Sequence, residues 1–112
     1  MSTFDELKKE VTDFRDERNW KQFHNPKDLA ICISIEAAEL LEIFQWSGKD
    51  LEVEGKRDKI EEELADVFMY CMLLADNRGM DIEEIVRKKL EVNRKNYPVE
   101  KSYGKSTKYN EL

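Results

Sequence analysis

The stretch that decides the fold runs from residue 31 to residue 44 and reads Ile-Cys-Ile-Ser-Ile-Glu-Ala-Ala-Glu-Leu-Leu-Glu-Ile-Phe. A second stretch, residues 63 to 75, reads Glu-Leu-Ala-Asp-Val-Phe-Met-Tyr-Cys-Met-Leu-Leu-Ala. Each is largely apolar, yet each carries two acids three residues apart, Glu36 with Glu39 and Glu63 with Asp66. Residues three apart lie on one face of a helix. The pattern therefore predicts two helices that place four carboxylates where a helical bundle would normally have its core.

These four acids need a positive partner if they are buried. An unpaired buried carboxylate is very costly, and the sequence has no surplus of lysine or arginine beside either pair. We expect a divalent cation, and ligands that are all oxygens favour Mg²⁺, or Mn²⁺ in its place, over Zn²⁺. A di-iron bundle would need Glu-x-x-His on each of two helices, whereas the only histidine, His24, precedes both stretches. The competing interpretation is a solvated acidic face, which we expect for Glu61 and Glu62.

Length and composition favour a single helical domain. A chain of 112 residues is long enough for one core, and we expect residues 1–112 to form one domain. The net charge of −6 argues against a general nucleic-acid binder. No run approaches the roughly 20 apolar residues that span a bilayer, and no signal peptide is visible. We therefore expect a cytoplasmic protein without a membrane partner, in which Cys32 and Cys71 are buried reduced thiols.

Four helical segments can be delimited. They are expected from about Thr3 to Arg18, from Pro26 to about Trp46, from about Lys56 to Arg78, and from the Asp81 cap to just before Pro98. Residues 98–112 form an irregular tail in this interpretation. Because the third and fourth segments are joined by a short link, we expect antiparallel neighbours and an all-α, four-helix bundle. The second segment is apolar around most of its circumference, which predicts a homo-oligomer.

Aromatic and basic residues form a second group of candidates. Trp20, His24 and Trp46 flank the second segment, and Tyr70 lies one turn beyond Asp66. Aromatic residues at helix ends are commonly core or interface residues, and the alternative is a set that stacks on a nucleotide base. The basic residues of the fourth segment either face solvent or reach phosphates.

The acidic motifs and their surroundings resemble the MazG-like all-α nucleoside triphosphate pyrophosphohydrolases. Glu-x-x-Glu and Glu-x-x-Asp are separated by 23 residues. Further motifs are similar to the dCTP pyrophosphatase branch and span nearly the whole chain: Glu17-Arg18-Asn19-Trp20-Lys21-Gln22-Phe23-His24-x-Pro26, Phe44-Gln45-Trp46, Asn93-Arg94-x-x-Tyr97-Pro98-Val99 and Lys108-Tyr109-x-Glu111-Leu112. Tyr103-Gly104-Lys105 departs from the pattern of that branch.

The resemblance implies an α-helical bundle that assembles as a dimer or, in this branch, a tetramer. It implies Mg²⁺-dependent cleavage of nucleoside triphosphates between the α and β phosphorus atoms. It implies that Glu36, Glu39, Glu63 and Asp66 ligate the metal. The implied contacts to base and sugar are Trp20, His24, Trp46 and Tyr70, and those to phosphates or sugar are Lys89, Asn93, Tyr97, Lys101 and Lys108.

The residues and the resemblance agree on metal-assisted hydrolysis of a phosphoanhydride. We expect Glu36 and Glu39 to be catalytic, with Glu36 accepting a proton from the attacking water. By the same resemblance, the expected substrate is dCTP or a 5-modified dCTP, removed as nucleotide house-cleaning. The alternatives are a member that prefers dUTP or another triphosphate, a nucleotide-binding regulator without turnover, and a structural oligomer whose acids are bridged by cations.

Overall fold

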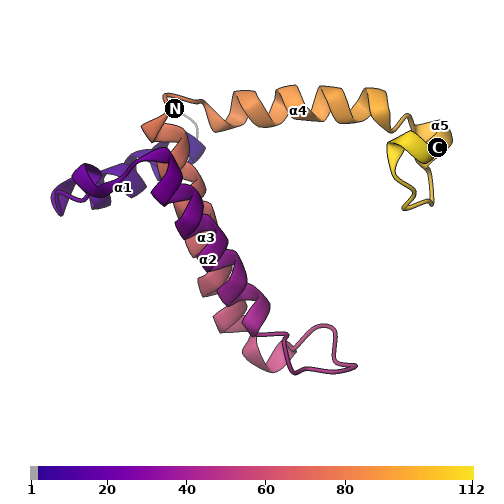
Figure 1. Cartoon of the computed structure of the whole chain (residues 1–112), viewed down its shortest axis with the longest axis horizontal. Coiled ribbons are helices and arrows are strands. Elements are labelled where there is room, and N and C mark those ends of the chain that lie inside the picture. The colour runs from indigo at the N-terminus through magenta and orange to yellow at the C-terminus, as the bar shows by residue number, and fades with distance from the viewer. Residues whose placement is uncertain (1–2) are drawn as a thin grey trace. The chain divides into compact units, whose positions relative to one another are not determined.

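The computed structural model describes residues 3–112, whose regular secondary structure consists of helices, with no strand (Figure 1). The helices are α1 (Thr3–Glu17), α2 (Pro26–Glu42), α3 (Arg57–Asn77), α4 (Ile82–Asn96) and the short α5 (Val99–Ser102). Three 3₁₀ turns accompany them, at Lys21–Phe23, Glu54–Lys56 and Tyr109–Glu111. The all-α prediction is therefore confirmed. Within the described part of the chain, no helix is long and apolar enough to cross a membrane.

Helix α2 begins where the sequence predicts and ends earlier. The Asn25 side chain accepts a hydrogen bond from the Asp28 backbone N–H at 2.9 Å, and Pro26 occupies the first turn. The helix stops at Glu42, because the next backbone N–H groups donate to carbonyls three residues back, as Phe44 does to Leu41 at 2.9 Å. The expected end near Trp46 is therefore wrong by about one helical turn.

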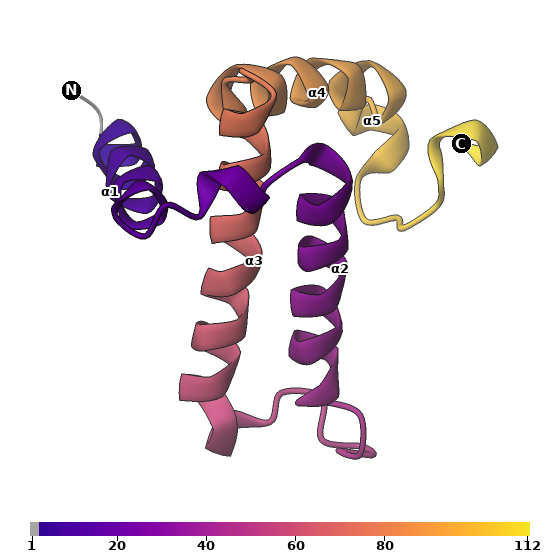
Figure 2. The same cartoon turned by 60° about the vertical axis from the view of Figure 1, so that its left-hand side comes forward.

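Helices α2 and α3 form an antiparallel hairpin (Figure 2). Helix α3 runs to Asn77 and is followed by Gly79, whose φ of 65° is left-handed, as predicted for a helix-ending glycine. The buried apolar side chains of this part are Leu29, Ile43, Val53, Met72, Leu73 and Ala75. Helix α1 packs against α3 and not between the two helices of the hairpin.

The hairpin leaves much of its apolar surface uncovered. Large side chains of α2 are exposed at Ile31, Ile35 and Leu41, and those of α3 at Leu64 and Phe68. The apolar circumference of α2 predicted that one small bundle would not cover it, and this surface agrees with that expectation. Cys32 and Cys71, expected to be buried, are free thiols and only half-buried, since they lie on these incompletely covered helices.

Contacts divide the chain into two compact units, one ending at Gly79 and one starting at Met80. In the second unit, the Asp81 carboxylate accepts a hydrogen bond from the Glu84 N–H at 3.2 Å, which confirms the predicted cap of α4. The tail is more regular than expected, because it contains α5 and the Tyr109–Glu111 turn. Tyr109 returns to the end of α4, where its ring meets Tyr97 edge-to-face at 5.8 Å.

Candidate metal and nucleotide site

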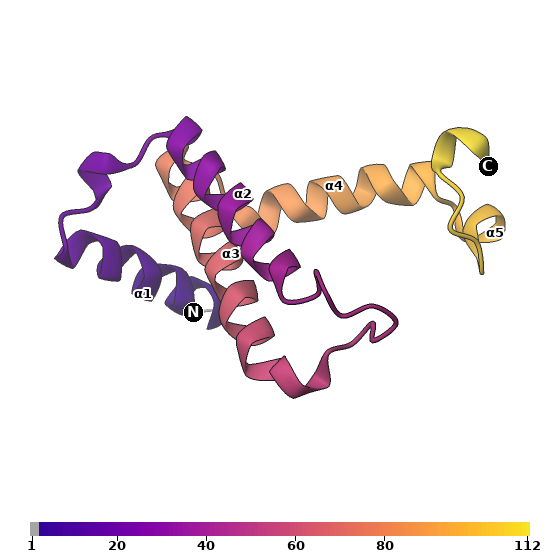
Figure 3. The same ribbon diagram turned by 60° about the horizontal axis from the view of Figure 1, so that its bottom comes forward.

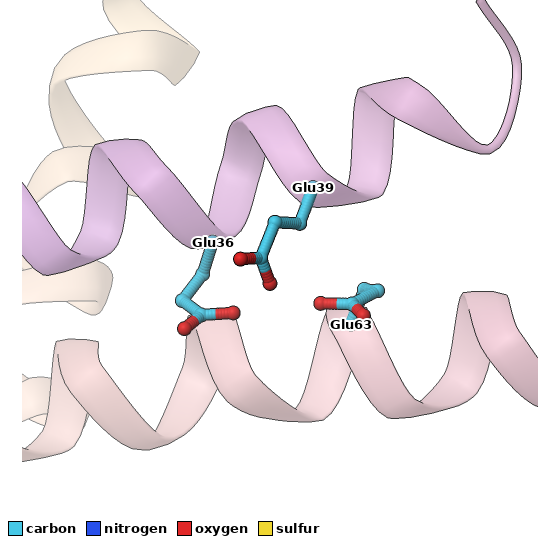
Figure 4. A group of neighbouring side chains, drawn as sticks. All are labelled: Glu36, Glu39 and Glu63. Atoms are coloured by element: carbon cyan, nitrogen blue, oxygen red, sulfur yellow. The ribbon is translucent and has the colours of Figure 1, made fainter.

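Three carboxylates from the hairpin converge on one point. Glu36 and Glu39 project from α2 toward Glu63 on α3 (Figure 4). One oxygen atom from each lies within 4.8 Å of the others. Glu63 is buried, and the other two are half-buried. The two acidic motifs, which are far apart in the sequence, therefore meet across the helix pair.

The electrostatics of the cluster are uneven. Burial raises the pKa of Glu36 to about 7, with the neighbouring carboxylates Glu39, Asp66 and Glu63 adding to the effect. The pKa of Glu63 is lowered instead, chiefly because Lys59 Nζ lies 3.0 Å from Glu63 Oε1. The expectation that no cation accompanies the acids is therefore wrong for Glu63. The signal was present in the sequence, since Lys59 precedes Glu63 by four residues, the spacing of an intrahelical ion pair.

Two oxygen atoms of the cluster have no hydrogen-bond partner among the described residues. They are Glu36 Oε2 and Glu63 Oε2, and both are buried. Mg²⁺ binds oxygen at about 2.0–2.1 Å, so two ligands of one ion lie at most about 4.2 Å apart. The 4.8 Å spread of the cluster needs only small side-chain rotations to meet this limit. The donor set, the negative charge and the unpartnered oxygens fit a hard divalent cation.

The fourth acid connects this cluster to an aromatic cavity. Asp66, half-buried and one turn beyond Glu63, lines a cavity of about 330 Å³. The same cavity is lined by Trp20, His24 and Tyr70. The structure thus brings together three of the four residues predicted to hold a base and sugar, and it places them next to a predicted metal ligand.

The surroundings of His24 favour the neutral form of its ring. Its pKa is lowered by burial and, to a smaller extent, by the positive charge of Arg15. Its Nδ1 atom is buried and has no hydrogen-bond partner within residues 3–112. A neutral imidazole offers one donor and one acceptor, so His24 has an unused polar atom at this cavity.

Arg15 organises the wall of the cavity formed by α1. Its side chain is only 4% exposed, and its Nη1 donates to Asp76 Oδ2 of α3 at 2.7 Å while Nε donates to Asp16 Oδ1 at 2.8 Å. Its backbone carbonyl accepts from the Trp20 N–H at 3.1 Å. Arg15 therefore links α3 to the segment that carries Trp20. Sequence reasoning missed this residue, because its partner Asp76 is 61 positions away.

Trp46 is not part of this cavity. It lines a separate hollow of about 220 Å³ with Ser47, Asp50 and Val53, and its side chain is 87% exposed. The connection that carries Trp46 leaves one end of the hairpin, whereas the segment with Trp20 and His24 lies at the other end (Figure 3). Within one chain, the structure does not bring the predicted group of Trp20, Trp46 and His24 together.

The remaining predicted contacts all belong to the second unit. Lys89 and Asn93 lie on α4, Tyr97 directly follows it, Lys101 lies on α5, and Lys108 precedes the last 3₁₀ turn. Asn93 is half-buried, and the other four are exposed.

Comparisons with known proteins identify the family of this chain. Residues 31–112 match the model of the MazG-like family. Over 115 aligned residues, 98% of the chain and 68% of the relative, the chain is 35% identical to dCTP pyrophosphatase 1 of Mus musculus and 34% identical to that of Homo sapiens. The crystal structure of a pyrophosphatase from Archaeoglobus fulgidus superposes with a TM-score of 0.81 and 44% identity, covering 88% of this chain and 94% of that one.

These relatives support the prediction of a hydrolase that acts on nucleotide phosphoanhydride bonds. The chain belongs to the MazG-like family.

Proposed function

We propose that this protein hydrolyses a nucleoside triphosphate between its α and β phosphorus atoms, giving the monophosphate and pyrophosphate. The observation that carries the proposal is the junction at Asp66, where the carboxylate cluster adjoins a cavity lined by Trp20, His24 and Tyr70. A base stacked in an apolar, aromatic cavity would leave its phosphates beside the acids. The names of the mammalian relatives support dCTP as the preferred substrate. We propose a 5-modified dCTP as a further substrate.

The proposed cofactor is Mg²⁺, with Mn²⁺ as a substitute. Glu36, Glu39, Glu63 and Asp66 would hold it, and the unpartnered oxygens of Glu36 and Glu63 support this assignment. When bound, the metal would neutralise triphosphate charge and lower the pKa of a water molecule. Oxygen ligands without any nitrogen or sulfur favour these hard ions.

The chain's own residues would supply positioning and a proton acceptor. A water molecule attacks the α phosphorus, the bond from that phosphorus to the bridging oxygen breaks, and pyrophosphate leaves with the bonding electron pair. Glu36 would take the proton of the water on the carboxylate oxygen that does not bind the metal. Glu39 lies beside it and would act in the same step by holding the metal ion, whose positive charge stabilises the transferring phosphoryl group.

We also propose substrate contacts for residues of the second unit. We assign Lys89, Asn93, Tyr97, Lys101 and Lys108 to the phosphates or the sugar, because they combine cationic and hydrogen-bonding groups on α4 and the tail. Residues 1–112 would then act as one domain. The biological role would be removal of an unwanted triphosphate from the cytoplasmic nucleotide pool.

A homo-oligomer, a tetramer or else a dimer, is part of the proposal. The exposed apolar side chains of α2 and α3, among them Ile35, Leu41 and Phe68, support it because such contiguous apolar faces are usually covered in solution. Trp46, 87% exposed, would be covered in the same way. Light scattering at micromolar concentration should give a multiple of the 13.3 kDa chain mass, and a monomer would contradict this part.

The test of the activity is pyrophosphate release from a panel of ribo- and deoxyribonucleoside triphosphates with Mg²⁺. Wild-type protein should release pyrophosphate and monophosphate, fastest from dCTP or 5-methyl-dCTP, and Glu39→Gln should not. No release from any triphosphate by folded wild-type protein would overturn the activity. Faster release from dUTP or a ribonucleotide would overturn only the choice of substrate.

A further inference from the structure

We propose that Lys59, assisted by Lys56, binds the β and γ phosphates of the substrate and the pyrophosphate that leaves. The two lysines line a cavity of about 510 Å³ whose other walls are Glu39, Glu42, Ile43 and Glu63. None of the expected phosphate contacts lies in this part of the chain. This inference rests on the proposed hydrolysis, since it assigns a place to the leaving group of that reaction.

The order of residues along α3 supports the assignment. Tyr70, Asp66, Glu63 and Lys59 follow one another at steps of three or four residues, and such steps keep residues on one face of a helix. At a rise of about 1.5 Å per residue, the distance along the axis from Lys59 to Tyr70 is about 16 Å. The aromatic cavity therefore lies at one end of this row, the carboxylates in the middle, and the lysines at the other end.

This order matches the order of groups in the substrate. With its base in the cavity beside Tyr70, a nucleotide that extends along the row has its α phosphate at the carboxylates. The β and γ phosphates then lie beside Lys59 and Lys56. Cleavage at the carboxylates releases the part of the substrate that the lysines hold, which is pyrophosphate.

Lys59 is ion-paired, but its ammonium group keeps a hydrogen-bond donor for an anion. Its Nζ lies 3.0 Å from Glu63 Oε1 and 3.6 Å from Glu62 Oε2. An ammonium group has three donors, so at least one is not engaged by these two acids. Glu63 Oε2 remains without a hydrogen-bond partner in the described chain, so Glu63 can contact Lys59 and a metal with different oxygens.

The start of α3 adds a positive electrostatic potential that favours phosphate binding. Lys56 occupies the N-cap position and offers no side-chain hydrogen bond to the first turn of this 21-residue helix. The uncapped N-terminal end of a helix carries partial positive charge, which favours phosphate groups. Lys56, Lys59 and this helix end thus supply positive charge at one side of the acidic cluster.

The alternative role for Lys59 is that of a counter-ion that only neutralises Glu63. The two roles differ in their effect on pyrophosphate. A counter-ion would matter for the carboxylate and the metal, whereas a phosphate ligand would matter for pyrophosphate and not for the monophosphate product. Binding of the two products therefore separates them.

The experiment is calorimetric titration of the Mg²⁺-loaded protein with inorganic pyrophosphate and, separately, with dCMP. In Lys59→Ala the dissociation constant for pyrophosphate should rise about tenfold or more, because a charge-assisted contact is lost. The dissociation constant for dCMP should change less than about twofold, and Lys59→Arg should keep most of the pyrophosphate affinity. The matched control is Lys9→Ala, since Lys9 makes an i,i+4 ion pair of the same kind, 2.7 Å from Asp13, on α1. It should alter neither titration.

Unchanged pyrophosphate affinity in Lys59→Ala, or an equal loss of affinity for both products, would overturn the proposal. Lys59→Gln serves if the alanine variant does not fold, as judged by circular dichroism. Failure of the proposed function has a different signature, which is absence of triphosphate hydrolysis by wild-type protein. Hydrolysis by wild-type protein together with unchanged pyrophosphate binding in Lys59→Ala would contradict the role of Lys59 and leave the proposed hydrolysis intact.

Discussion

Two places in the first unit hold buried charge, and they differ in how that charge is paired. The Arg15 side chain is 4% exposed, and its guanidinium contacts two carboxylates, Asp16 and Asp76, at 2.8 and 2.7 Å. The acidic cluster gathers three carboxylates with one lysine, Lys59, beside Glu63. Glu36 and Glu63 each keep a buried oxygen without a hydrogen-bond partner among residues 3–112. A buried charge with its partners in place holds structure together. A buried charge without them points to a ligand that the chain alone does not provide.

The largest effect on activity is expected when one acid of the cluster is neutralised. Glu36→Gln should lower turnover of the preferred triphosphate by roughly a hundredfold to ten-thousandfold, the usual cost of losing a general base. Its melting temperature in metal-free buffer should not fall. The neutral form of Glu36 is already favoured by burial and by its acidic neighbours, which raise its pKa to about 7. Pyrophosphate release and thermal melting check the two parts, and a large loss of stability would contradict the second.

At the ion pairs of Arg15, a substitution is expected to lower stability. Arg15→Ala should lower the free energy of unfolding by roughly 2 kcal/mol, because it removes hydrogen bonds between charged groups and leaves Asp76 without its partner. Urea denaturation at fixed protein concentration measures this change. Arg15→Lys keeps the charge and is the matched control. A stability of Arg15→Ala equal to that of wild-type protein would show that the pair contributes nothing.

Metal should act on the unpaired site alone. At a Mg²⁺ concentration ten times its dissociation constant, wild-type protein should be stabilised by about 1.4 kcal/mol, and chelation should reverse this. The stabilisation should persist in Arg15→Lys and vanish in Glu63→Gln. Thermal melting with and without Mg²⁺ measures it. Equal stabilisation of Glu63→Gln and wild-type protein would place the metal elsewhere.

The smallest effect is expected from pH, through His24. Its pKa is lower in the folded protein than its ordinary value of about 6.5, because burial and then Arg15 disfavour the imidazolium. The neutral ring therefore contributes stability that is present above the unfolded pKa and is lost as the pH falls through the folded pKa. His24→Gln should weaken the loss of stability between about pH 7 and pH 5. Melting curves of both proteins across this range give the answer, and identical pH dependence would contradict it.

The sequence was informative wherever the decisive contacts were local. Helix caps such as Asn25 and Asp81 act within three residues, and both were predicted correctly. The acids at i and i+3 were predicted to share a helix face, and Glu36 and Glu39 do. Their meeting with Glu63 across two helices followed from the apolar surroundings of both motifs, which required the helices to pack against each other.

Contacts between residues far apart in the chain were harder to predict from the sequence. Nothing near Arg15 in the sequence distinguishes it from an exposed arginine, because its burial depends on how α1 meets α3. Trp46 was grouped with Trp20 and His24 because they flank the same helix. However, 17 residues of helix rise by about 25 Å, so residues at its two ends cannot share one cavity within the chain. The ion pair between Lys59 and Glu63 could have been predicted from the sequence, since the two residues have the i,i+4 spacing of an intrahelical pair.

One measurement tests most directly whether the unpaired charges, and not the paired ones, are the reactive centre. Wild-type protein, Arg15→Lys and Glu36→Gln are incubated side by side with dCTP and Mg²⁺, and the products are separated by anion exchange. We predict dCMP and pyrophosphate from wild-type protein and Arg15→Lys, and almost none from folded Glu36→Gln. Wild-type rates in folded Glu36→Gln, or dCDP and phosphate as the products, would contradict the account.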